Sequence, residues 1–226
     1  MIANSMLESA EQSHLIIEKR TRSDIVVGVP HHAPAGVHTL PCPEHSDSDE
    51  NTGFIGRHIA KRLDCCSIIA CNSTIDPNKH LDSDYTKRIV EWSPKVLIEI
   101  HGHGKVRSKY DVEISCGSIG HTRYSEDLAA VINRKLSEDE DFADVSVSGR
   151  FVDLYFRATK TLTITDTRWL AYHIELSSRL RKPKNGQPGR PTAFAYRFAG
   201  NWQPHFSRNT DKNNQNKNTL CNLVGY

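Results

Sequence analysis

The segment VLIEIHGHG, residues 96–104, decides the fold class that we predict for this chain. Its apolar first half is typical of a buried strand, and its second half brings two histidines flanked by glycines. Two other apolar runs end in a similar way: IVVGVPHH at 25–32 ends in a histidine pair, and AYHIEL at 171–176 carries a glutamate. Enzymes built on parallel sheets keep their chemistry at the carboxyl ends of the strands. The three segments together predict a metal site with a nearby catalytic carboxylate.

Strand and helix patterns alternate around these segments. We predict strands at 25–29, 67–71 and 96–100. Two helices separate them: one at 51–63, behind a possible cap at Asp49, and one at 83–92. Beyond them the patterns favour a strand at 111–115, a helix at 124–136 and short strands at 145–148, 151–156, 161–165 and 171–176. The segment before residue 25 reads as helical or frayed. This order predicts one α/β domain with a mixed, mostly parallel sheet and helices on both faces.

Composition limits the classes of protein to consider. A chain of 226 residues with 37% hydrophobic residues supports one core, which we place in residues 1–205, followed by a polar tail at 206–226. The net charge of +2, from 29 basic and 27 acidic residues, indicates no nucleic-acid or membrane partner. No apolar run approaches the ~20 residues of a membrane span, and the N-terminus lacks the apolar core of a secretory signal. We therefore expect a cytoplasmic protein, and the sequence leaves its oligomeric state open.

The six cysteines favour neither a disulfide framework nor a zinc ribbon. Cys65 and Cys66 are adjacent, and no C-x-x-C pair occurs. We expect reduced, mostly buried thiols.

Histidines and carboxylates gather in the 28 residues from 31 to 58. Five of the twelve histidines lie in this window, together with four acidic residues: His31, His32, His38, His45, His58, Glu44, Asp47, Asp49 and Glu50. Imidazole and carboxylate groups suit Zn²⁺, although a solvated polar loop has the same composition. A second source of histidine at another strand end favours the metal site.

That second source is the pair His101 and His103. Two residues apart, they would face the same side of a continuing strand, but we expect Gly102 and Gly104 to interrupt the strand there. We favour His101 as the ligand because it lies nearer the rigid strand, and His103 as a residue that contacts substrate or orients a ligand. Glu99 is either the hydrogen-bond partner of His101 or a buried structural acid.

Glu175 is the predicted general base. A carboxylate among apolar strand residues tends to have a raised pKa, which suits proton transfer from water. The alternative interpretation is that Glu175 lies on an edge strand and faces solvent. The basic segment after it, which includes Arg179, would hold an acidic substrate or lie on a solvated surface.

Five short motifs, taken in order, resemble the landmarks of the N-formylglutamate amidohydrolase family, which is similar to the zinc carboxypeptidases and aspartoacylases. These are PHHAP at 30–34, SDENTG at 48–53, DPNK at 76–79, LIEIHGHG at 97–104 and HIELSSRLR at 173–181. The resemblance spans about residues 25–181 and implies a zinc-carboxypeptidase-like fold. It places the first metal histidine at His31, with His32 as its competitor, and the metal carboxylate at Asp49, with Glu50 adjacent.

The same resemblance implies that the turn with Asn78 and Lys79 grips a substrate carboxylate, with Arg179 as a further candidate. Two residues depart from the family pattern, since Lys79 stands where the family has arginine and Asn72 replaces another arginine. A lysine offers a point charge in place of the arginine fork, so the substrate is expected to differ.

We therefore expect a zinc-dependent hydrolase that cleaves an amide bond of an N-acyl amino acid or of a glutamyl or peptide-like substrate with a carboxylate. Metal is expected at His31, Asp49 or Glu50, and His101. Two alternatives remain: a non-catalytic member of the same fold that binds metal or a small acid, and a metal-free interaction protein.

Overall fold

The strands of this protein form one sheet whose apolar runs are buried on both faces. The computed structural model describes residues 2–104, 107–182, 194–195 and 198. The elements in chain order are α1 (Ile2–Leu7), β1 (His14–Glu18), β2 (Arg22–Ala33), β3 (Asp49–Glu50), α2 (Thr52–Leu63), β4 (Cys65–Cys71), α3 (Asp84–Trp92), β5 (Val96–His103), β6 (Val112–Ser115), α4 (Thr122–Ser137), β7 (Val147–Ser148), α5 (Leu162–Thr165), β8 (Leu170–Ser177) and α6 (Ser178–Arg181). Short 3-10 helices span Ile119–His121 and Phe151–Asp153.

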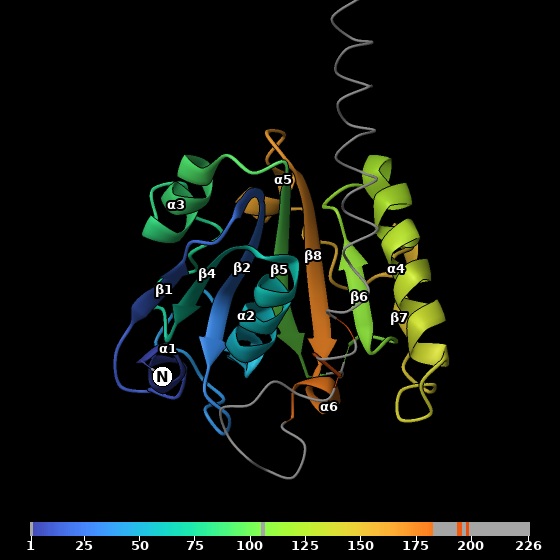
Figure 1. Ribbon diagram of the computed structural model, residues 1–226, viewed down its shortest axis with the longest axis horizontal. Coiled ribbons are helices and arrows are strands. Elements are labelled where there is room, and N and C mark those ends of the chain that lie inside the picture. The colour runs from blue at the N-terminus through green and yellow to red at the C-terminus, as the bar shows by residue number, and fades with distance from the viewer. Residues whose placement is uncertain (1, 105–106, 183–193, 196–197, 199–226) are drawn as a thin grey trace, which may run out of the picture.

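The sheet has the order β1-β4-β2-β5-β8-β6-β7, and β3 pairs with β2 beside this path. Strands β4, β2, β5 and β8 are parallel neighbours, while β1 and β6 run antiparallel to β4 and β8. The arrowheads of β2, β5 and β8 point to the same edge of the sheet in Figure 1. The predicted fold class, an α/β domain with a mixed, mostly parallel sheet, is confirmed.

Helices cover the two faces of the sheet with different parts of the core. Helix α2 packs on the face to which Val27, Ile98 and Ile100 point, and α4 extends this cluster. Helix α3 packs on the opposite face, where Tyr85 and Leu97 belong to a second cluster. Because strand side chains alternate between faces, each buried strand contributes to both clusters.

Several predicted elements need correction. Residues 161–165 were expected to form a strand, yet 162–165 form helix α5, and 151–153 form a 3-10 helix. Strand β1 departs from the prediction of a helical or frayed segment before residue 25. Strand β5 continues to His103 through Gly102, so the glycine does not break it. Asn51, with φ at 65°, occupies the N-cap position of α2 without a side-chain capping bond, and Asp49, the predicted cap, lies in β3.

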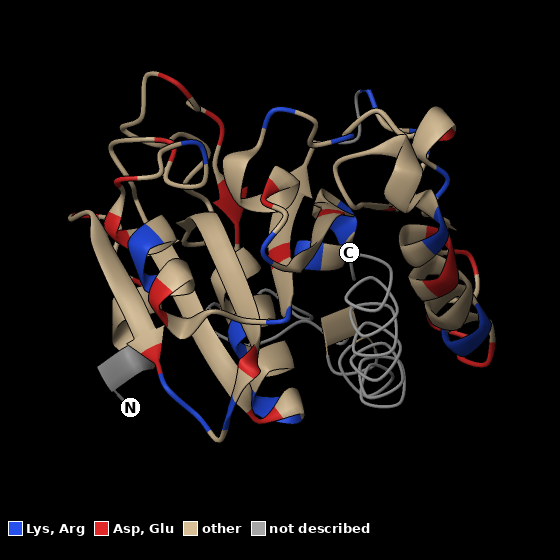
Figure 2. Ribbon diagram, turned by 90° about the horizontal axis from the view of Figure 1, so that it is seen from above, with Lys and Arg blue, Asp and Glu red and all other residues tan. Residues whose placement is uncertain are grey.

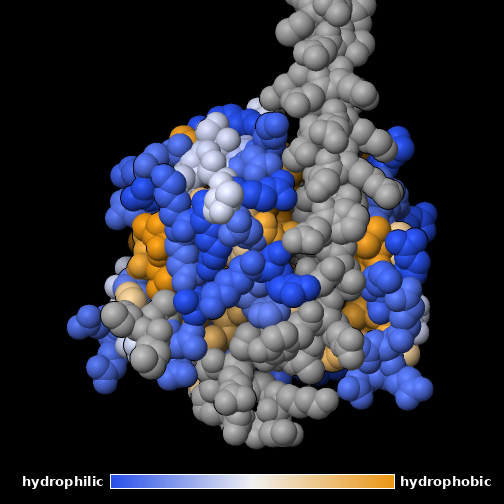
Figure 3. All heavy atoms as spheres, viewed as in Figure 1, coloured by the Kyte–Doolittle hydropathy of each residue, from blue (hydrophilic) through white to orange (hydrophobic). Residues whose placement is uncertain are grey.

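The surface carries both signs of charge. Figure 2 shows acidic and basic residues interspersed on the helices and loops, with both signs along α4. In the view of Figure 3 the described surface is mainly hydrophilic, with smaller apolar areas between polar ones. Among the described residues, no helix has the length and apolar character that a bilayer crossing requires. The predicted tail at 206–226 lies outside the described residues.

Candidate metal centre

The candidate site lies at the carboxyl ends of β2, β5 and β8. Strands β5 and β8 are parallel neighbours in which Glu99 pairs with His173 and His101 pairs with Glu175. The side chains of these two residue pairs lie on the α3 face of the sheet, because strand side chains alternate between faces. Their neighbours Ile98 and Ile100 in β5, and Ile174 and Leu176 in β8, belong to the core on the α2 face. The two strands thus present apolar residues near their starts and chemistry-bearing residues near their ends.

The adjacent histidines His31 and His32 have different surroundings at an irregularity in β2. The pairing of β2 with β4 shifts between Val29 and His32. His32 lies under α2, where its Nδ1 accepts from the Gly53 amide at 3.0 Å and its Nε2 lies 3.0 Å from the Leu7 carbonyl oxygen. Both ring nitrogens of His32 are therefore occupied, and burial lowers its pKa to about 4.

His31, by contrast, lies with Asp49 and His101 in a buried cluster. The Asp49 Oδ2 atom is 3.4 Å from the Nδ1 atom of His31 and 3.4 Å from the Nδ1 atom of His101. One potential ligand atom from each of the three side chains lies within 4.8 Å of the others. Neither His31 Nδ1 nor Asp49 Oδ2 has a hydrogen-bond partner of ordinary geometry.

The spacing of these atoms fits a zinc ion better than a hydrogen-bonded pair. Charge-assisted N–H···O bonds are usually about 2.7–2.9 Å long. Ligand atoms about 2.0–2.1 Å from a tetrahedral zinc ion lie about 3.3–3.4 Å from one another. Two imidazoles and one carboxylate also form a donor set typical of catalytic zinc, which leaves a position open for water or substrate.

The second nitrogen of each cluster histidine faces another carboxylate. His31 Nε2 lies 2.9 Å from Asp76 Oδ1, and His101 Nε2 lies 3.4 Å from Glu99 Oε2. Metal-bound histidines commonly have such a carboxylate partner, which fixes the orientation of the ring. Both rings are thereby turned so that Nδ1 points toward Asp49.

In the absence of metal, the carboxylates and imidazoles of the cluster stabilise each other's charged forms. Burial alone would lower the pKa of His101, but Asp49 and Glu99 raise it to about 10. Burial disfavours ionisation of Asp49 as well, yet the two rings hold the pKa of its carboxyl well below the usual range. Metal binding at this cluster would have to displace protons from the imidazoles.

Glu175 is buried beside this cluster, with its Oε1 atom 3.5 Å from the Nε2 atom of His173. Only 6% of the residue is exposed, and its Oε2 atom has no hydrogen-bond partner. Burial raises the pKa of its carboxyl to about 8, although the positive charge on His101 opposes the rise. A carboxyl of that kind is suited to exchange protons near neutral pH.

Two further histidines pack against the rings of this cluster: His45, which the sequence offered only as one of the histidine-rich window, and His173, which was not expected at the site. The His45 ring stacks on the His31 ring at 3.8 Å, and burial lowers its pKa to about 4. The His173 ring lies 4.2 Å from the His101 ring, and burial also lowers its pKa. His173 alternates with Glu175 in one strand, so the period of two could have identified it. His45 lies in the histidine-rich window, where no periodic pattern distinguishes it.

Other predicted site residues lie apart from the cluster or are held by internal contacts. The Glu50 carboxylate is directed away from the cluster and accepts from the Gly36 amide at 3.0 Å, so Asp49 is the member of that pair that faces the histidines. The Asn78 Nδ2 atom donates to Glu99 at 3.0 Å, and the Lys79 ammonium donates to Asp76 at 2.5 Å.

Two further candidates for substrate binding are His103, the last residue of β5, and Arg179 in α6. The Arg179 guanidinium donates to both Asp111 and Asp144, neither of which belongs to the cluster. The His103 ring packs on the Phe156 ring at a centroid distance of 5.4 Å. These contacts favour a structural role for Arg179.

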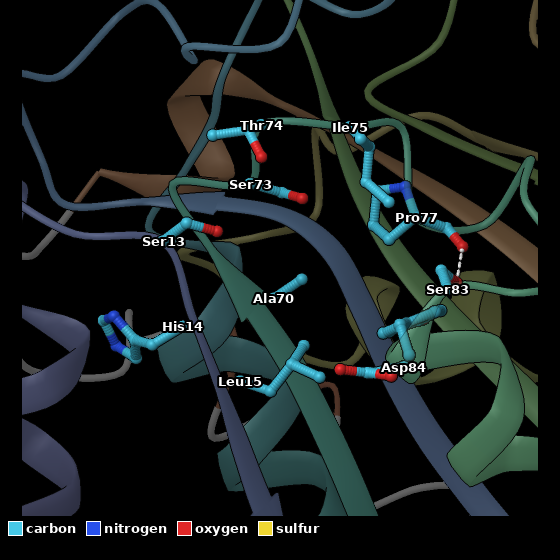
Figure 4. A pocket seen from close by; sticks show the side chains of 11 residues that line it. Ser13, His14, Leu15, Ala70, Ser73, Thr74, Ile75, Pro77, Ser83 and Asp84 are labelled. Atoms are coloured by element: carbon cyan, nitrogen blue, oxygen red, sulfur yellow. Dashed lines mark hydrogen bonds between the residues drawn. The ribbon is translucent and has the colours of Figure 1, made fainter.

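A pocket lies next to the turn at 76–79. Figure 4 shows its lining by residues of β1, β4, the following turn and the start of α3, among them Ser13, Leu15, Ala70 and Ser73. The pocket contains none of the cluster residues. It therefore does not define the candidate site.

Fold and cluster together define a class of protein: an α/β domain with a buried histidine–aspartate–histidine cluster at the carboxyl edge of a mostly parallel sheet. The fold is similar to that of the poly-gamma-glutamate hydrolase of a bacteriophage, with a TM-score of 0.58 and 13% identity over 93% of this chain and 96% of that chain. The gene product Atu2144 of Agrobacterium tumefaciens is similar over 90% of this chain and 97% of that chain, with a TM-score of 0.50 and 14% identity.

An N-formylglutamate amidohydrolase from Ralstonia eutropha JMP134 is less similar, with a TM-score of 0.47 and 11% identity over 84% of this chain and 94% of that chain. That likeness is too weak to carry an argument. No protein-family model matches the chain, and no curated protein is similar to it in sequence. At these identities the similarities establish the fold alone.

Proposed function

We propose that the protein is a zinc-dependent hydrolase that cleaves an amide bond in a substrate carrying a carboxylate. The observation that carries the proposal is the convergence of three buried ligand atoms, with Asp49 Oδ2 at 3.4 Å from one nitrogen of each of His31 and His101. A buried carboxyl of raised pKa, Glu175, lies on the neighbouring strand in register with His101. Such a combination is typical of hydrolases that use a metal and a carboxylate base.

In this proposal His31, Asp49 and His101 hold the metal through Nδ1, Oδ2 and Nδ1. When bound there, zinc supplies polarisation of the substrate carbonyl and a water molecule of pKa about 7. Asp76 and Glu99 keep the two rings oriented. Glu175 would accept a proton from the attacking water as the C–O bond forms, and would then deliver it to the nitrogen of the leaving amine as the C–N bond breaks.

The substrate is proposed to be an N-acyl amino acid or a glutamyl or peptide-like amide. The phage protein of similar fold is a poly-gamma-glutamate hydrolase, a name consistent with this class. Lys79 is the preferred partner for the substrate carboxylate, because 43% of its side chain is exposed although it also pairs with Asp76. His103 is proposed to contact substrate, whereas Asn78 and Arg179 serve mainly their internal partners.

The test is an assay of purified protein that has been stripped of metal and then supplied with zinc. Poly-γ-glutamate, γ-glutamyl peptides and N-acyl glutamates would be compared with matched amides that lack the carboxylate. We expect hydrolysis that requires zinc and favours the carboxylate-bearing substrates. Bound zinc without turnover of any substrate would contradict the proposed reaction.

That last outcome would support a second candidate function, metal or small-acid binding without catalysis. The internal contacts of Asn78, Lys79 and Arg179 favour it, because three predicted substrate-binding groups already have protein partners. A protein that takes up no zinc at all would instead support a metal-free interaction protein.

A further inference from the structure

Glu99 is a fully buried carboxylate that joins the candidate metal centre to α3. Its Oε2 atom faces the ring of His101 at 3.4 Å and accepts from Asn78 at 3.0 Å. Its Oε1 atom accepts from the Tyr85 hydroxyl at 2.9 Å. The relative exposure of Glu99 is 0%, so these protein groups replace water around the carboxylate.

The Tyr85 hydroxyl reaches Glu99 across β2, next to Gly28. A Cβ atom at Gly28 would collide with the Tyr85 hydroxyl and would approach Cγ of Glu99 to 3.3 Å. The glycine therefore leaves the space through which the two side chains meet. Burial raises the pKa of Tyr85 well above its usual value, so the hydroxyl keeps its proton and donates a hydrogen bond to Glu99.

Helix α3 also holds the turn that carries Asp76. The hydroxyls of Ser83 and Thr86 donate to the Pro77 carbonyl oxygen at 2.6 and 2.9 Å, and the first of these bonds is drawn in Figure 4. The start of α3 thus binds Glu99 directly through Tyr85, and it binds Pro77, the residue that follows Asp76 in the turn.

We propose that Tyr85 is a positioning residue of the metal centre. By donating to one oxygen of Glu99, it holds the carboxylate so that the other oxygen faces His101 Nε2 and the Nδ1 atom points toward Asp49. This inference rests on the proposed function, because a fixed His101 ring matters most if it binds a metal. It assigns a role at the site to a helix that contributes no proposed ligand.

The test replaces the hydroxyl alone. Tyr85→Phe keeps the aromatic ring in the core and removes the bond to Glu99. We expect zinc affinity, measured by competition with a chelator, to fall about tenfold, at the low end of the 10- to 100-fold range for partners of metal ligands. Tyr124→Phe, on the remote helix α4, is the matched control and should leave zinc affinity unchanged. Thermal unfolding of each variant shows whether the fold is retained.

A double-variant cycle tests the route through Glu99. Glu99→Gln should itself weaken zinc binding, and adding Tyr85→Phe to it should change the affinity less than twofold, because the carboxylate on which the hydroxyl acts is gone. Additive tenfold losses would overturn the assignment. So would unchanged zinc affinity in Tyr85→Phe, an outcome that leaves the proposed function intact.

A measurement without metal separates the two proposals. In protein with ¹⁵N-labelled histidine and no metal, Tyr85→Phe should shift the ring resonances of His101, assigned with His101→Gln, whereas Tyr124→Phe should not. If wild-type protein takes up no zinc, the proposed function fails and these resonances alone decide the positioning role. Resonances that match the wild type in Tyr85→Phe would contradict it.

Discussion

At the scale of the residue, Glu175 is the group that the proposed reaction depends on most directly. Glu175→Gln preserves shape and burial but removes the proton acceptor. We expect turnover to fall about 10²- to 10⁴-fold, the usual contribution of general acid–base catalysis, while zinc content stays at the wild-type level. Paired measurements of hydrolysis rate and zinc content test this. Retained activity in the zinc-loaded variant would contradict the assignment of the base.

The adjacent acids Asp49 and Glu50 form a matched pair of substitutions. Only Asp49 directs its carboxylate at the two rings, whereas Glu50 accepts from Gly36. We expect Asp49→Asn to weaken zinc binding at least 100-fold, because the ligand charge is lost, and Glu50→Gln to change it little. Chelator competition on both variants provides the comparison. Equal losses would show that Asp49 has no special part in metal binding.

The sequence favoured His101 and Glu175 as candidates because each interrupts or ends an apolar strand. The choice between His31 and His32 depends on an irregularity in β2 that no periodic pattern reveals. The hydrogen-bond partners of Asn78 and Lys79 could not be predicted either, because the folded chain brings Glu99 to Asn78 and turns Asp76 toward Lys79.

At the scale of the element, Glu18 connects the edge strand β1 to helix α2. Its carboxylate accepts from Arg57 at 2.7 Å and also pairs with Arg20. Burial favours the neutral form, but the bonds from Arg57 and the nearby guanidinium charges lower the pKa of Glu18 below 4.5. Because the pKa is lower in the folded state, this contribution to stability is present above pH about 4.5 and is lost as the pH falls through the folded value.

Glu18→Gln is therefore expected to lower the free energy of unfolding by about 1–2 kcal/mol at pH 7, with the difference from wild type shrinking toward pH 3. Denaturant unfolding at several pH values measures it. The exposed residue Glu11, changed to Gln, serves as the control. A difference from wild type that stays constant down to pH 3 would contradict the role of the Glu18 charge.

Long periodic elements were predicted well, and short ones were not. Helix α3 was expected at 83–92 and runs over Asp84–Trp92 with Ser83 as its cap, because a cap, an apolar face and a following proline agree. Four apolar and β-branched residues at 162–165 were read as a strand but form a helix, since so short a run fits either period. Strand β3 has two residues, and its pairing with β2 alone defines it.

At the scale of the whole molecule, the proposed centre joins distant parts of the chain, since His31, Asp49 and His101 come from β2, β3 and β5. Zinc that binds this arrangement only in the folded state must stabilise it. Free zinc at about 100 times its dissociation constant is expected to add about 2.7 kcal/mol to the free energy of unfolding. Magnesium, which prefers oxygen ligands, should add little.

Thermal unfolding with and without each metal measures this effect, and His31→Ala provides the control in which zinc should lose most of its influence. Equal stabilisation of the wild type and the variant by zinc would indicate binding elsewhere on the chain.

The α/β class and the parallel direction of the central strands were predictable because strand and helix alternate, and parallel strands bring their carboxyl ends to one edge. The order of the strands and the edge position of β1 were not, since both depend on which surfaces pack together.

The most direct measurement is the zinc content of the purified protein, by elemental analysis, beside that of the double variant His31→Ala/His101→Ala. We expect about one zinc per wild-type chain and none in the folded variant. A wild-type protein that holds no zinc after it has been supplied, or a variant that keeps its full content, would contradict the proposed metal centre.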